Sequence, residues 1–465
     1  MRGKPELLMI DPAKILLPST ARGIPLSLIG AGDWKRFHSN LPSETKNWAD
    51  AIGFKAEAGK VLLVPGTKGV LAAVLAGASE SDHFVSGQIS RLLPEGTYAF
   101  DASPQSSHLA VLGWCLEAYS FGTYGKAPSR AVRLVCPRDV NRDAVLRSAR
   151  ASFLVRDLIN TPASDMGPDE LEAAARALAG AFKAKMKVTS GKALEREFPM
   201  IHAVGRASPR APRLLDFSWG PLKAPKVTLV GKGVCFDTGG LDIKPASGML
   251  LMKKDMGGAA TVLGLAQMIM AAKLPVRLRV LIPAVENSIA GNAFRPGDVL
   301  RSRKGITVEI GNTDAEGRLV LGDALALADA EKPDLLIDMA TLTGAARVAL
   351  GPDLPPFYTD DDALAREIDE AGGQENDPVW RMPFWQPYGR LFESPVADMN
   401  NSGDSGFAGS ITAALFLKRF VENAKAYVHF DVFAWTPAAR PGRPKGGEAQ
   451  AMRALFAVIA RRFAK

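Results

Sequence analysis

The stretch that organises this chain is Asn312-Thr313-Asp314-Ala315-Glu316-Gly317-Arg318-Leu319, which lies between a strand-like apolar run at residues 306–310 and a helix-like run at residues 319–330. Two carboxylates and a guanidinium therefore stand at alternate positions after a strand end. In an extended or turning segment, side chains two residues apart point the same way, so these three groups can face one cavity. The pattern predicts a site for metal ions and anions. The simpler alternative is a solvated turn before a helix N-terminus, where acidic residues are common.

A second polar group lies upstream of this stretch. Residues 226–230 predict a buried strand that runs into the glycine-rich segment 231–240, and further charges follow in residues 244–260. Four of the charged side chains have glycine-rich or apolar neighbours: Lys232, Asp237, Lys244 and Asp255. Charged groups in such surroundings are usually paired or bound to a metal.

The two groups together supply four carboxylates as hard oxygen ligands: Asp237, Asp255, Asp314 and Glu316. Their negative charges match two divalent cations. Carboxylate sites without His or Cys suit Mn²⁺ or Mg²⁺, and Zn²⁺ also accepts carboxylate oxygens. A pair of metal ions can hold a bridging water as hydroxide and polarise a carbonyl group. The residue set therefore predicts hydrolytic chemistry.

Four motifs carry a resemblance to a known family. They are G-K-G-x-x-F-D-x-G-G at residues 231–240, I-K-P at 243–245, M-x-x-D-M-G-G-A-A at 252–260 and N-T-D-A-E-G-R-L at 312–319. In this order they resemble the leucyl aminopeptidase family, also called the cytosol aminopeptidases or peptidase family M17. The resemblance extends from about residue 151 to the end of the chain.

The resemblance implies a ligand set for two divalent metal ions per subunit, Mn²⁺ or Zn²⁺. One ion would be held by Asp237, Asp314 and Glu316. The other would be held by Lys232, Asp237, Asp255 and Glu316, so that Asp237 and Glu316 bridge the pair. Lys232 must be neutral to act as a ligand, and both burial and two adjacent cations would lower its pKa.

The resemblance also implies the catalytic and substrate-binding residues. Lys244 would stay protonated and stabilise the charge that builds on the substrate carbonyl oxygen. Arg318 would hold a bicarbonate ion that acts as general base. The residues expected near the substrate are Met252, Asn312, Thr341, Leu342 and Gly344. A methionine with small neighbours predicts an apolar pocket for a Leu-like or Met-like first residue.

The chain divides into two predicted α/β domains joined by a helix. Residues 1–138 predict a smaller N-terminal α/β domain, and residues 139–160 predict a linking helix that ends before a proline. Residues 161–465 predict the larger catalytic dinuclear-metal aminopeptidase domain, in which strands, including one at 201–204, alternate with helices. This alternation predicts a central mixed sheet flanked by helices, with the ligands at strand ends.

Composition favours an ordinary globular protein in the cytoplasm. Hydrophobic residues make up 47% of the 465 residues and charged residues 23%. The start, Met1–Pro5, lacks the apolar segment of a signal peptide, and the uncharged run 256–272 suits a core helix better than a membrane span. The three cysteines have no metal-ligand spacing. The net charge of +8 is spread along the chain, which indicates a solvated positive surface rather than a nucleic-acid site.

Two features in the last quarter of the chain qualify this interpretation. His429 alternates with apolar residues on a predicted strand, which favours a core or supporting role over metal ligation. The loop Ser402–Phe407 departs from the family pattern, in which many members carry a basic residue. This departure bears on substrate preference and not on the metal chemistry.

The leading hypothesis is a metallo-aminopeptidase that hydrolyses the N-terminal residue from peptides by means of a two-metal bridging hydroxide. The resemblance implies a homohexamer, and no membrane partner is expected. One alternative is a narrow dipeptidase, for instance one acting on Cys-Gly. Another is a non-catalytic DNA-binding protein that keeps the fold. A two-metal phosphatase is disfavoured, because such sites usually include His ligands.

Overall fold

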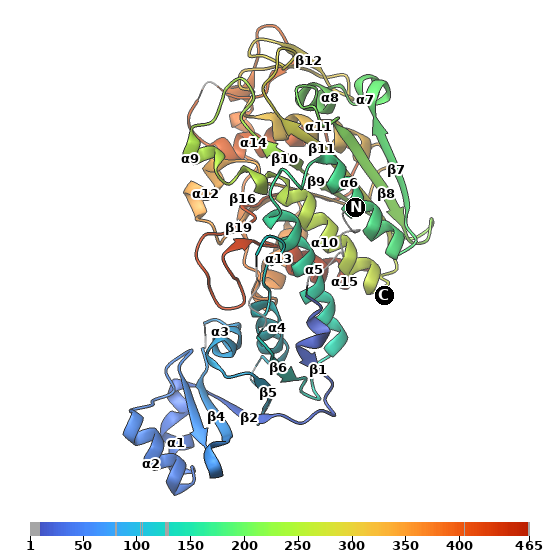
Figure 1. Cartoon of the computed structure of the whole chain (residues 1–465). Helices are drawn as coiled ribbons and strands as arrows, with labels where there is room; N and C mark the ends of the chain where they lie inside the picture. The colour runs from blue at the N-terminus through green and yellow to red at the C-terminus, as the bar shows by residue number, and fades with distance from the viewer. Residues whose placement is uncertain are drawn as a thin grey trace. The chain divides into compact units, whose positions relative to one another are not determined.

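The computed structural model of the chain describes residues 10–79, 81–102, 104, 106–125, 130–403 and 405–463. They form two compact units (Figure 1). Unit 1 comprises Met1–Phe153 with Thr436–Lys445, and unit 2 comprises Leu154–Trp435 with Gly446–Lys465. The division falls inside the helix α5, Arg142–Asn160. The start of the chain at Met1–Pro5, on which the signal-peptide argument rests, lies outside the described residues.

Unit 1 is an α/β unit with a six-stranded sheet of order β1-β6-β5-β2-β4-β3. All neighbouring strands are parallel except the antiparallel pair β3 and β4. The strands are β1 Leu16–Leu17, β2 Ile24–Ile29, β3 Val61–Pro65, β4 Leu71–Gly77, β5 Gly96–Phe100 and β6 Val132–Val135. The helices are α1 Trp34–Ser39, α2 Ser43–Ile52, α3 Val85–Leu92 and α4 Ser107–Glu117. The prediction of a smaller N-terminal α/β domain is confirmed.

Unit 2 is built on a nine-stranded mixed sheet of order β16-β15-β18-β14-β9-β11-β8-β7, with β10 paired to β11. The strands are β7 Lys185–Ser190, β8 Arg213–Trp219, β9 Lys226–Gly231, β10 Gly233–Asp237, β11 Arg277–Asn287, β14 Leu335–Ala340, β15 Pro356–Tyr358, β16 Trp380–Met382 and β18 Tyr427–Asp431. Strands β18, β14, β9 and β11 form a parallel central block. Strands β7 and β8 continue it in antiparallel pairs, so the predicted mixed sheet is confirmed.

Helices cover this sheet in two groups, in each of which the first two helices contact strands and the third packs mainly on other helices. The first group comprises α6 Pro168–Ala181, α10 Gly257–Ala271 and α15 Met452–Phe463. The second comprises α8 Pro199–Gly205, α11 Glu316–Asp329 and α14 Gly409–Lys418. The other α-helices after α5 are α7 Gly191–Glu197, α9 Ala246–Met249, α12 Gly344–Leu350 and α13 Asp362–Gln374. The strands of the small sheets are β12 Val299–Arg301, β13 Thr307–Glu309, β17 Met399–Asn400, β19 Trp435–Thr436 and β20 Gly446–Gly447, and the 3-10 helices are η4 Met252–Met256 and η5 Gln386–Phe392.

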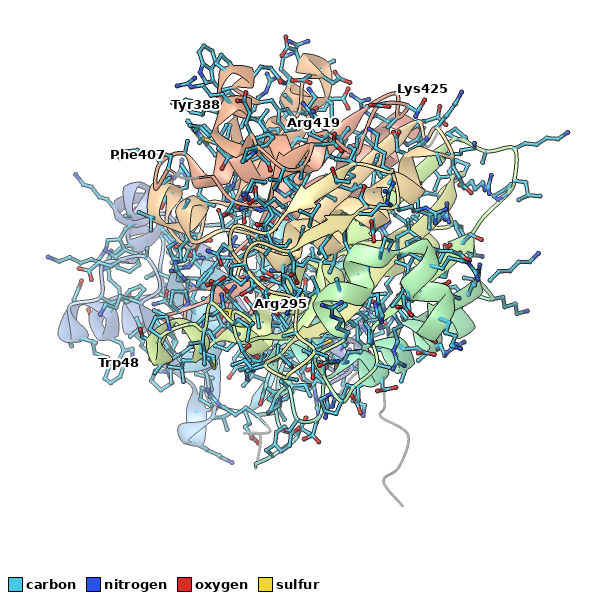
Figure 2. All side chains as sticks on the ribbon, turned by 90° about the horizontal axis from the view of Figure 1, so that it is seen from above. Trp48, Arg295, Tyr388, Phe407, Arg419 and Lys425 are labelled. Atoms are coloured by element: carbon cyan, nitrogen blue, oxygen red, sulfur yellow. The ribbon has the colours of Figure 1, made fainter. Side chains whose placement is uncertain are left out.

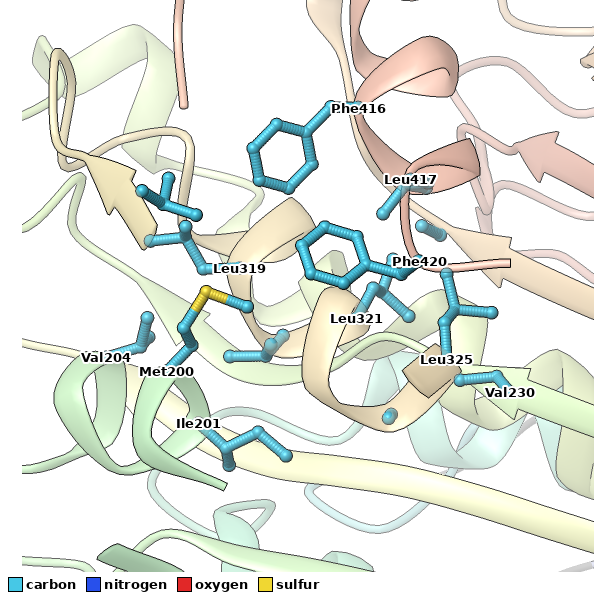
Figure 3. Packing of buried hydrophobic residues seen from close by; sticks show 14 of the residues in the cluster. Met200, Ile201, Val204, Val230, Leu319, Leu321, Leu325, Phe416, Leu417 and Phe420 are labelled. Atoms are coloured by element: carbon cyan, nitrogen blue, oxygen red, sulfur yellow. The ribbon is translucent and has the colours of Figure 1, made fainter. Parts of the chain in front are cut away.

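The second helix group contributes many side chains to the hydrophobic core of unit 2 (Figure 3). Met200 of α8 and Leu319 and Leu325 of α11 pack in one cluster with Phe416 and Phe420 of the α14 segment. Each of these side chains is fully buried. A buried side chain of this size stabilises the fold by about 1.5–3 kcal/mol, so this cluster fixes where the first turn of α11 lies.

The predicted strand at residues 201–204 is wrong, because these residues belong to the helix α8. A short apolar run fits a buried strand and a buried helix equally well. Pro199 occupies the first turn, where proline is favoured. The backbone N–H groups of Met200 and Ile201 donate to the carboxylate of Asp323 on α11, at 2.9 and 3.3 Å. The group that caps this helix is therefore more than a hundred residues away in sequence.

The uncharged run 256–272 forms the core helix α10, as predicted. Its start lies very close to the sheet, since a Cβ atom at Gly258 would lie 2.0 Å from the carbonyl oxygen of Met339. Glycine is therefore required at this position. Among the described residues, we find no helix with the length and apolar character needed to cross a membrane.

The Asp323 cap leads to a pH-dependent prediction for stability. Burial raises the pKa of Asp323 to about 7, although three backbone N–H groups oppose this shift. The folded-state pKa lies above the unfolded value of about 3.9, so the folded protein binds the extra proton between these values. The contribution of Asp323 to the free energy of unfolding should therefore fall as the pH rises from about 4 to 7, by up to about 1.4 kcal/mol per pH unit.

Urea unfolding of the wild type and of the variant Asp323→Asn across this pH range measures that contribution. The stability difference, wild type minus variant, is expected to decrease with rising pH because asparagine does not titrate. A difference that does not vary with pH would contradict the assigned pKa.

Candidate metal centre

The ligands predicted from the sequence meet at the carboxyl edge of the parallel strands. Lys232 follows β9 directly, and Asp237 is the last residue of β10. Asp255 lies in the 3-10 helix Met252–Met256, and Glu316 is the first residue of α11. Parallel strands present their carboxyl ends on one edge, where open α/β sheets place ligand sites. The sheet therefore brings together side chains that span more than eighty residues of sequence.

Three carboxylates form a group with the geometry of a metal site. One oxygen from each of Asp237, Asp255 and Glu316 lies within 4.8 Å of the others. These side chains are 2%, 3% and 1% exposed. Buried carboxylates this close repel one another, so the group requires nearby positive charge.

Two lysines supply positive charge within the protein. The Nζ atom of Lys232 lies 2.7 Å from Oδ2 of Asp255 and 2.9 Å from Oε1 of Glu316. The Nζ atom of Lys244 lies 2.8 Å from Oδ2 of Asp237 and also pairs with Asp314. Each of the two ammonium groups thus pairs with two of the four predicted carboxylates.

The pKa values of these groups reflect their crowding. Burial, and then the charge of Asp237, raises the pKa of Glu316 to about 8 and that of Asp314 to about 6. Burial lowers the pKa of Lys232, but the charges of Asp255 and Glu316 outweigh burial and raise it well above the ordinary value. Among the protein's own groups Lys232 is therefore held protonated, and a neutral Lys232 would require the added charge of bound cations.

The stretch 312–319 is a turn that enters a helix and not an extended segment. Helix α11 begins at Glu316, three residues before the predicted start at Leu319. Asn312 shapes the turn, because its side-chain oxygen accepts a hydrogen bond of 2.7 Å from the backbone N–H of Asp314. The local core that holds α11 is formed by residues distant in sequence, which explains the missed helix start.

The centre opens into a cavity of about 310 Å³. The metal-ligand candidates Lys232, Asp237, Asp255, Asp314 and Glu316 line it together with Lys244, Met252, Thr341, Leu342 and Gly344. Two predicted site residues, Asn312 and Arg318, do not line this cavity. The cavity therefore unites ten of the twelve predicted site residues.

Arg318 lies beside the centre and is fixed by one hydrogen bond. Its Nη1 donates to the backbone oxygen of Asn401 at 2.7 Å, and its guanidinium carbon lies 5.9 Å from the ring centre of Phe416. The Nε atom is buried without a hydrogen-bond partner. Burial lowers the pKa of Arg318 to about 10, so the side chain remains a cation at neutral pH.

Two supporting residues escaped the sequence analysis. Asn287, at the end of β11, donates from Nδ2 to Oδ1 of Asp237 at 2.9 Å and to the backbone oxygen of Thr313 at 3.1 Å. Asp431, at the end of β18, accepts hydrogen bonds from the backbone N–H groups of Leu342 and Thr343. In the sequence, each of these residues is only a polar residue at the end of an apolar run. Such a residue indicates a role at the site only when the order of the strands in the sheet is known.

The two features noted in the last quarter of the chain have clear positions. His429 is fully buried on β18, with its Nδ1 2.7 Å from Oδ1 of Asp338, so it is a core residue. In the loop Ser402–Phe407, the side chain of Phe407 is 83% exposed, and Figure 2 shows it at the molecular surface. Asp404 of the same loop lies outside the described residues.

The fold and the site together define the class of protein to which the chain belongs. A mixed α/β sheet that gathers buried carboxylates and lysines at its carboxyl edge is a scaffold suited to divalent cations. Family comparison then identifies the chain. Residues 153–456 match the model described as the cytosol aminopeptidase family, catalytic domain, and residues 24–137 match the M17 aminopeptidase N-terminal domain. The chain belongs to the cytosol aminopeptidase family.

Individual relatives agree with this assignment. A solved cytosol aminopeptidase from Coxiella burnetii is 48% identical, with a TM-score of 0.93 over 96% of this chain and 99% of that one. The bottromycin maturation enzyme BotP, solved in complex with Mn, is 30% identical, with a TM-score of 0.86 over 95% of this chain and 100% of that one. A probable cytosol aminopeptidase from Chlamydia muridarum is 45% identical over 286 residues. That match covers 60% of this chain but only 57% of the Chlamydia protein.

The close packing of Lys232 against α11 leads to a prediction about Gly317. A Cβ atom at Gly317 would lie 2.5 Å from Cε and 2.8 Å from Nζ of Lys232. The variant Gly317→Ala should therefore displace Lys232 from Asp255 and Glu316 and cost about 1–3 kcal/mol of stability. Urea unfolding and the Mn²⁺ content after loading measure both effects.

A matched control is Gly180→Ala near the end of α6, where an added Cβ meets no atom within 4 Å. Alanine is favoured over glycine in a helix by up to about 1 kcal/mol, so this control should retain both stability and metal content. Equal behaviour of the two variants would contradict the proposed clash.

Proposed function

We propose that this protein is a metal-dependent aminopeptidase that removes the N-terminal residue from peptides. The observation that carries this proposal is the convergence of Asp237, Asp255 and Glu316 within 4.8 Å at the wall of a cavity. Membership of the cytosol aminopeptidase family and the manganese complex of the relative BotP support it. Within the chain, residues 161–465 would form the catalytic domain, with residues 139–160 as a linking helix.

The donor set fits a pair of divalent cations such as Mn²⁺ or Zn²⁺. The site is rich in carboxylates, and its buried acids lack enough positive charge from the protein alone. Asp237, Asp314 and Glu316 would hold one ion, and Lys232, Asp237, Asp255 and Glu316 would hold the other. Such ions, when bound, activate water and polarise the scissile carbonyl group.

Lys244 is proposed as the residue that stabilises negative charge on the substrate carbonyl oxygen. Its ammonium group lines the cavity and already pairs with two carboxylates of the centre. Asp237 and Asp314 raise its pKa against the effect of burial, so it remains a cation throughout the neutral range. A charge held in place before the reaction needs no reorganisation in the transition state.

Arg318 is proposed to hold a bicarbonate ion beside the centre. Its buried, unpartnered Nε and its permanent charge are suited to a planar oxyanion. Asn401 restrains the other end of the guanidinium through its backbone oxygen. Asn312 would act indirectly, because its side chain fixes the turn that presents Asp314.

The substrate side of the proposal rests on the cavity wall. Met252, Thr341, Leu342 and Gly344 would contact the first residue, with a Leu-like or Met-like side chain accepted. Assembly as a homohexamer and a cytoplasmic location remain predictions, the latter supported by the name cytosol aminopeptidase of the relatives. The comparisons give no support to a narrow Cys-Gly dipeptidase or to a non-catalytic DNA-binding protein.

Mutation should distinguish the metal ligand Asp255 from Lys244, the residue proposed to stabilise charge on the substrate. Asp255→Ala removes a ligand, so both Mn²⁺ content and amide hydrolysis should be lost. Lys244→Ala removes only the stabilising charge, so metal content should be retained while kcat falls by about 10²–10³. Metal analysis and turnover of leucine p-nitroanilide measure the two effects. Metal loss in the Lys244 variant, or full turnover in the Asp255 variant, would refute the assignment.

The free α-amine of the substrate should be essential. Acetylation removes the basic lone pair by which the amine can be held at the cations. The first peptide bond is then no longer positioned for hydrolysis. Leu-Gly-Gly is expected to be hydrolysed at its first bond and N-acetyl-Leu-Gly-Gly to be resistant, as followed by chromatography. Efficient cleavage of the acetylated peptide would exclude an aminopeptidase.

A further inference from the structure

The cavity contains a buried lysine that the proposed mechanism does not use. Lys254 lies between the candidate ligand Asp255 and Lys253, is 5% exposed, and lines the cavity. Its Nζ atom lies 4.8 Å from the ring centre of Phe433, just after β18. It forms no ion pair with any carboxylate of the described chain.

A second cation lies against the same ring. The guanidinium carbon of Arg347 on α12 lies 5.0 Å from the ring centre of Phe433. Arg347 also lines the cavity and is exposed, and within the described residues it has no ion-pair partner. One aromatic ring in the cavity wall therefore carries two positive side chains, which repel each other.

In the described part of the chain, no carboxylate forms an ion pair with either of these cations. A buried cation is normally paired, and a cation–π contact offsets only about 0.5–2 kcal/mol of its desolvation. Asp431 also lines the cavity and acts electrostatically on Lys254, but its carboxylate is already hydrogen-bonded to other groups. It accepts hydrogen bonds from Leu342, from both the backbone and the hydroxyl group of Thr343, and from Ser410.

The net charge of the whole cavity also favours binding of an anion. In the proposed function, two divalent cations balance the four carboxylates of the centre. Lys244, Lys254 and Arg347 then contribute three positive charges to the wall and Asp431 one negative charge, so two positive charges remain in excess when Lys232 is a neutral ligand. A cavity with net positive charge attracts and orients an anionic substrate group.

We infer that Lys254 and Arg347, held against Phe433, form a subsite that binds a carboxylate of the peptide substrate. This inference rests on the proposed function. The carboxylate has two possible sources, namely the side chain of an acidic first residue and the C-terminus of a dipeptide. An acidic first residue would extend the substrate range beyond the Leu-like and Met-like residues predicted from the pocket.

Two pairs of substrates test the subsite and separate these sources. Glutamate p-nitroanilide and glutamine p-nitroanilide differ only at the side chain, whereas Leu-Gly and Leu-Gly-amide differ only at the C-terminus. In at least one pair, kcat/KM should be about tenfold or more higher for the carboxylate form, as expected for a hydrogen-bonded charge pair. Ratios close to one in both pairs would overturn the inference.

Variants of Lys254 and Arg347 test whether these two cations cause the preference for the carboxylate form of the substrate. Arg347→Gln and Lys254→Met should each reduce the raised ratio by about tenfold. Because Arg347 is exposed, its variant remains informative if burial makes the Lys254 variant unstable. The matched control is Lys253→Met, since Lys253 donates to the backbone oxygen of Asn160 and does not line the cavity. Its ratio should equal that of the wild type, and a ratio insensitive to Arg347→Gln would overturn the assignment.

If the protein is not an aminopeptidase, the result differs from a failure of the subsite alone. In that case none of the four substrates is hydrolysed, with or without Mn²⁺. Intact ligands can then be compared directly by calorimetry with the Mn²⁺-loaded protein. Tighter binding of the carboxylate form, weakened by Arg347→Gln, would support the subsite, and equal binding within each pair would overturn it.

Discussion

The burial of several carboxylates at one edge of a sheet is the constraint on which the rest of unit 2 depends. Asp237, Asp255 and Glu316 are each at most 3% exposed, and burial raises the pKa of Glu316 to about 8. An arrangement of this kind persists only where positive charge is held within contact distance. Lys232 and Lys244 provide that charge within the chain. The same excess of buried oxygen ligands makes the site receptive to divalent cations.

Close backbone packing makes this arrangement rigid. The glycine at position 258 lets the start of α10 approach the end of β14, and Asp255, which lies just ahead of this helix, is thereby held at the sheet edge. On the other side, the glycine at position 317 leaves room for the side chain of Lys232. Side chains that hold ions must be positioned by well-packed elements, and these two glycines allow that packing.

The cavity draws its two kinds of side chain from elements that overlap at one point. The candidate metal ligands Lys232, Asp237 and Glu316 come from strand ends and from the first turn of α11. The 3-10 helix Met252–Met256 carries both the candidate ligand Asp255 and the proposed subsite residue Lys254. Arg347 and Phe433 come from α12 and from the segment after β18. Short helices and loops can change without disturbing the sheet, so the part of the proposed subsite outside the 3-10 helix can vary on a fixed scaffold.

The sequence by itself determined the α/β class and the residue types of the centre, because strand periodicity and closely spaced acids are local properties. Only the tertiary structure decided that residues 201–204 form a helix, since their cap comes from Asp323. It also decided that Asn287 supports Asp237, that Arg318 lies outside the cavity, and that two unpaired cations meet at Phe433. These features depend on contacts between residues far apart in the chain, and such contacts are set by strand order and packing, which no local pattern encodes.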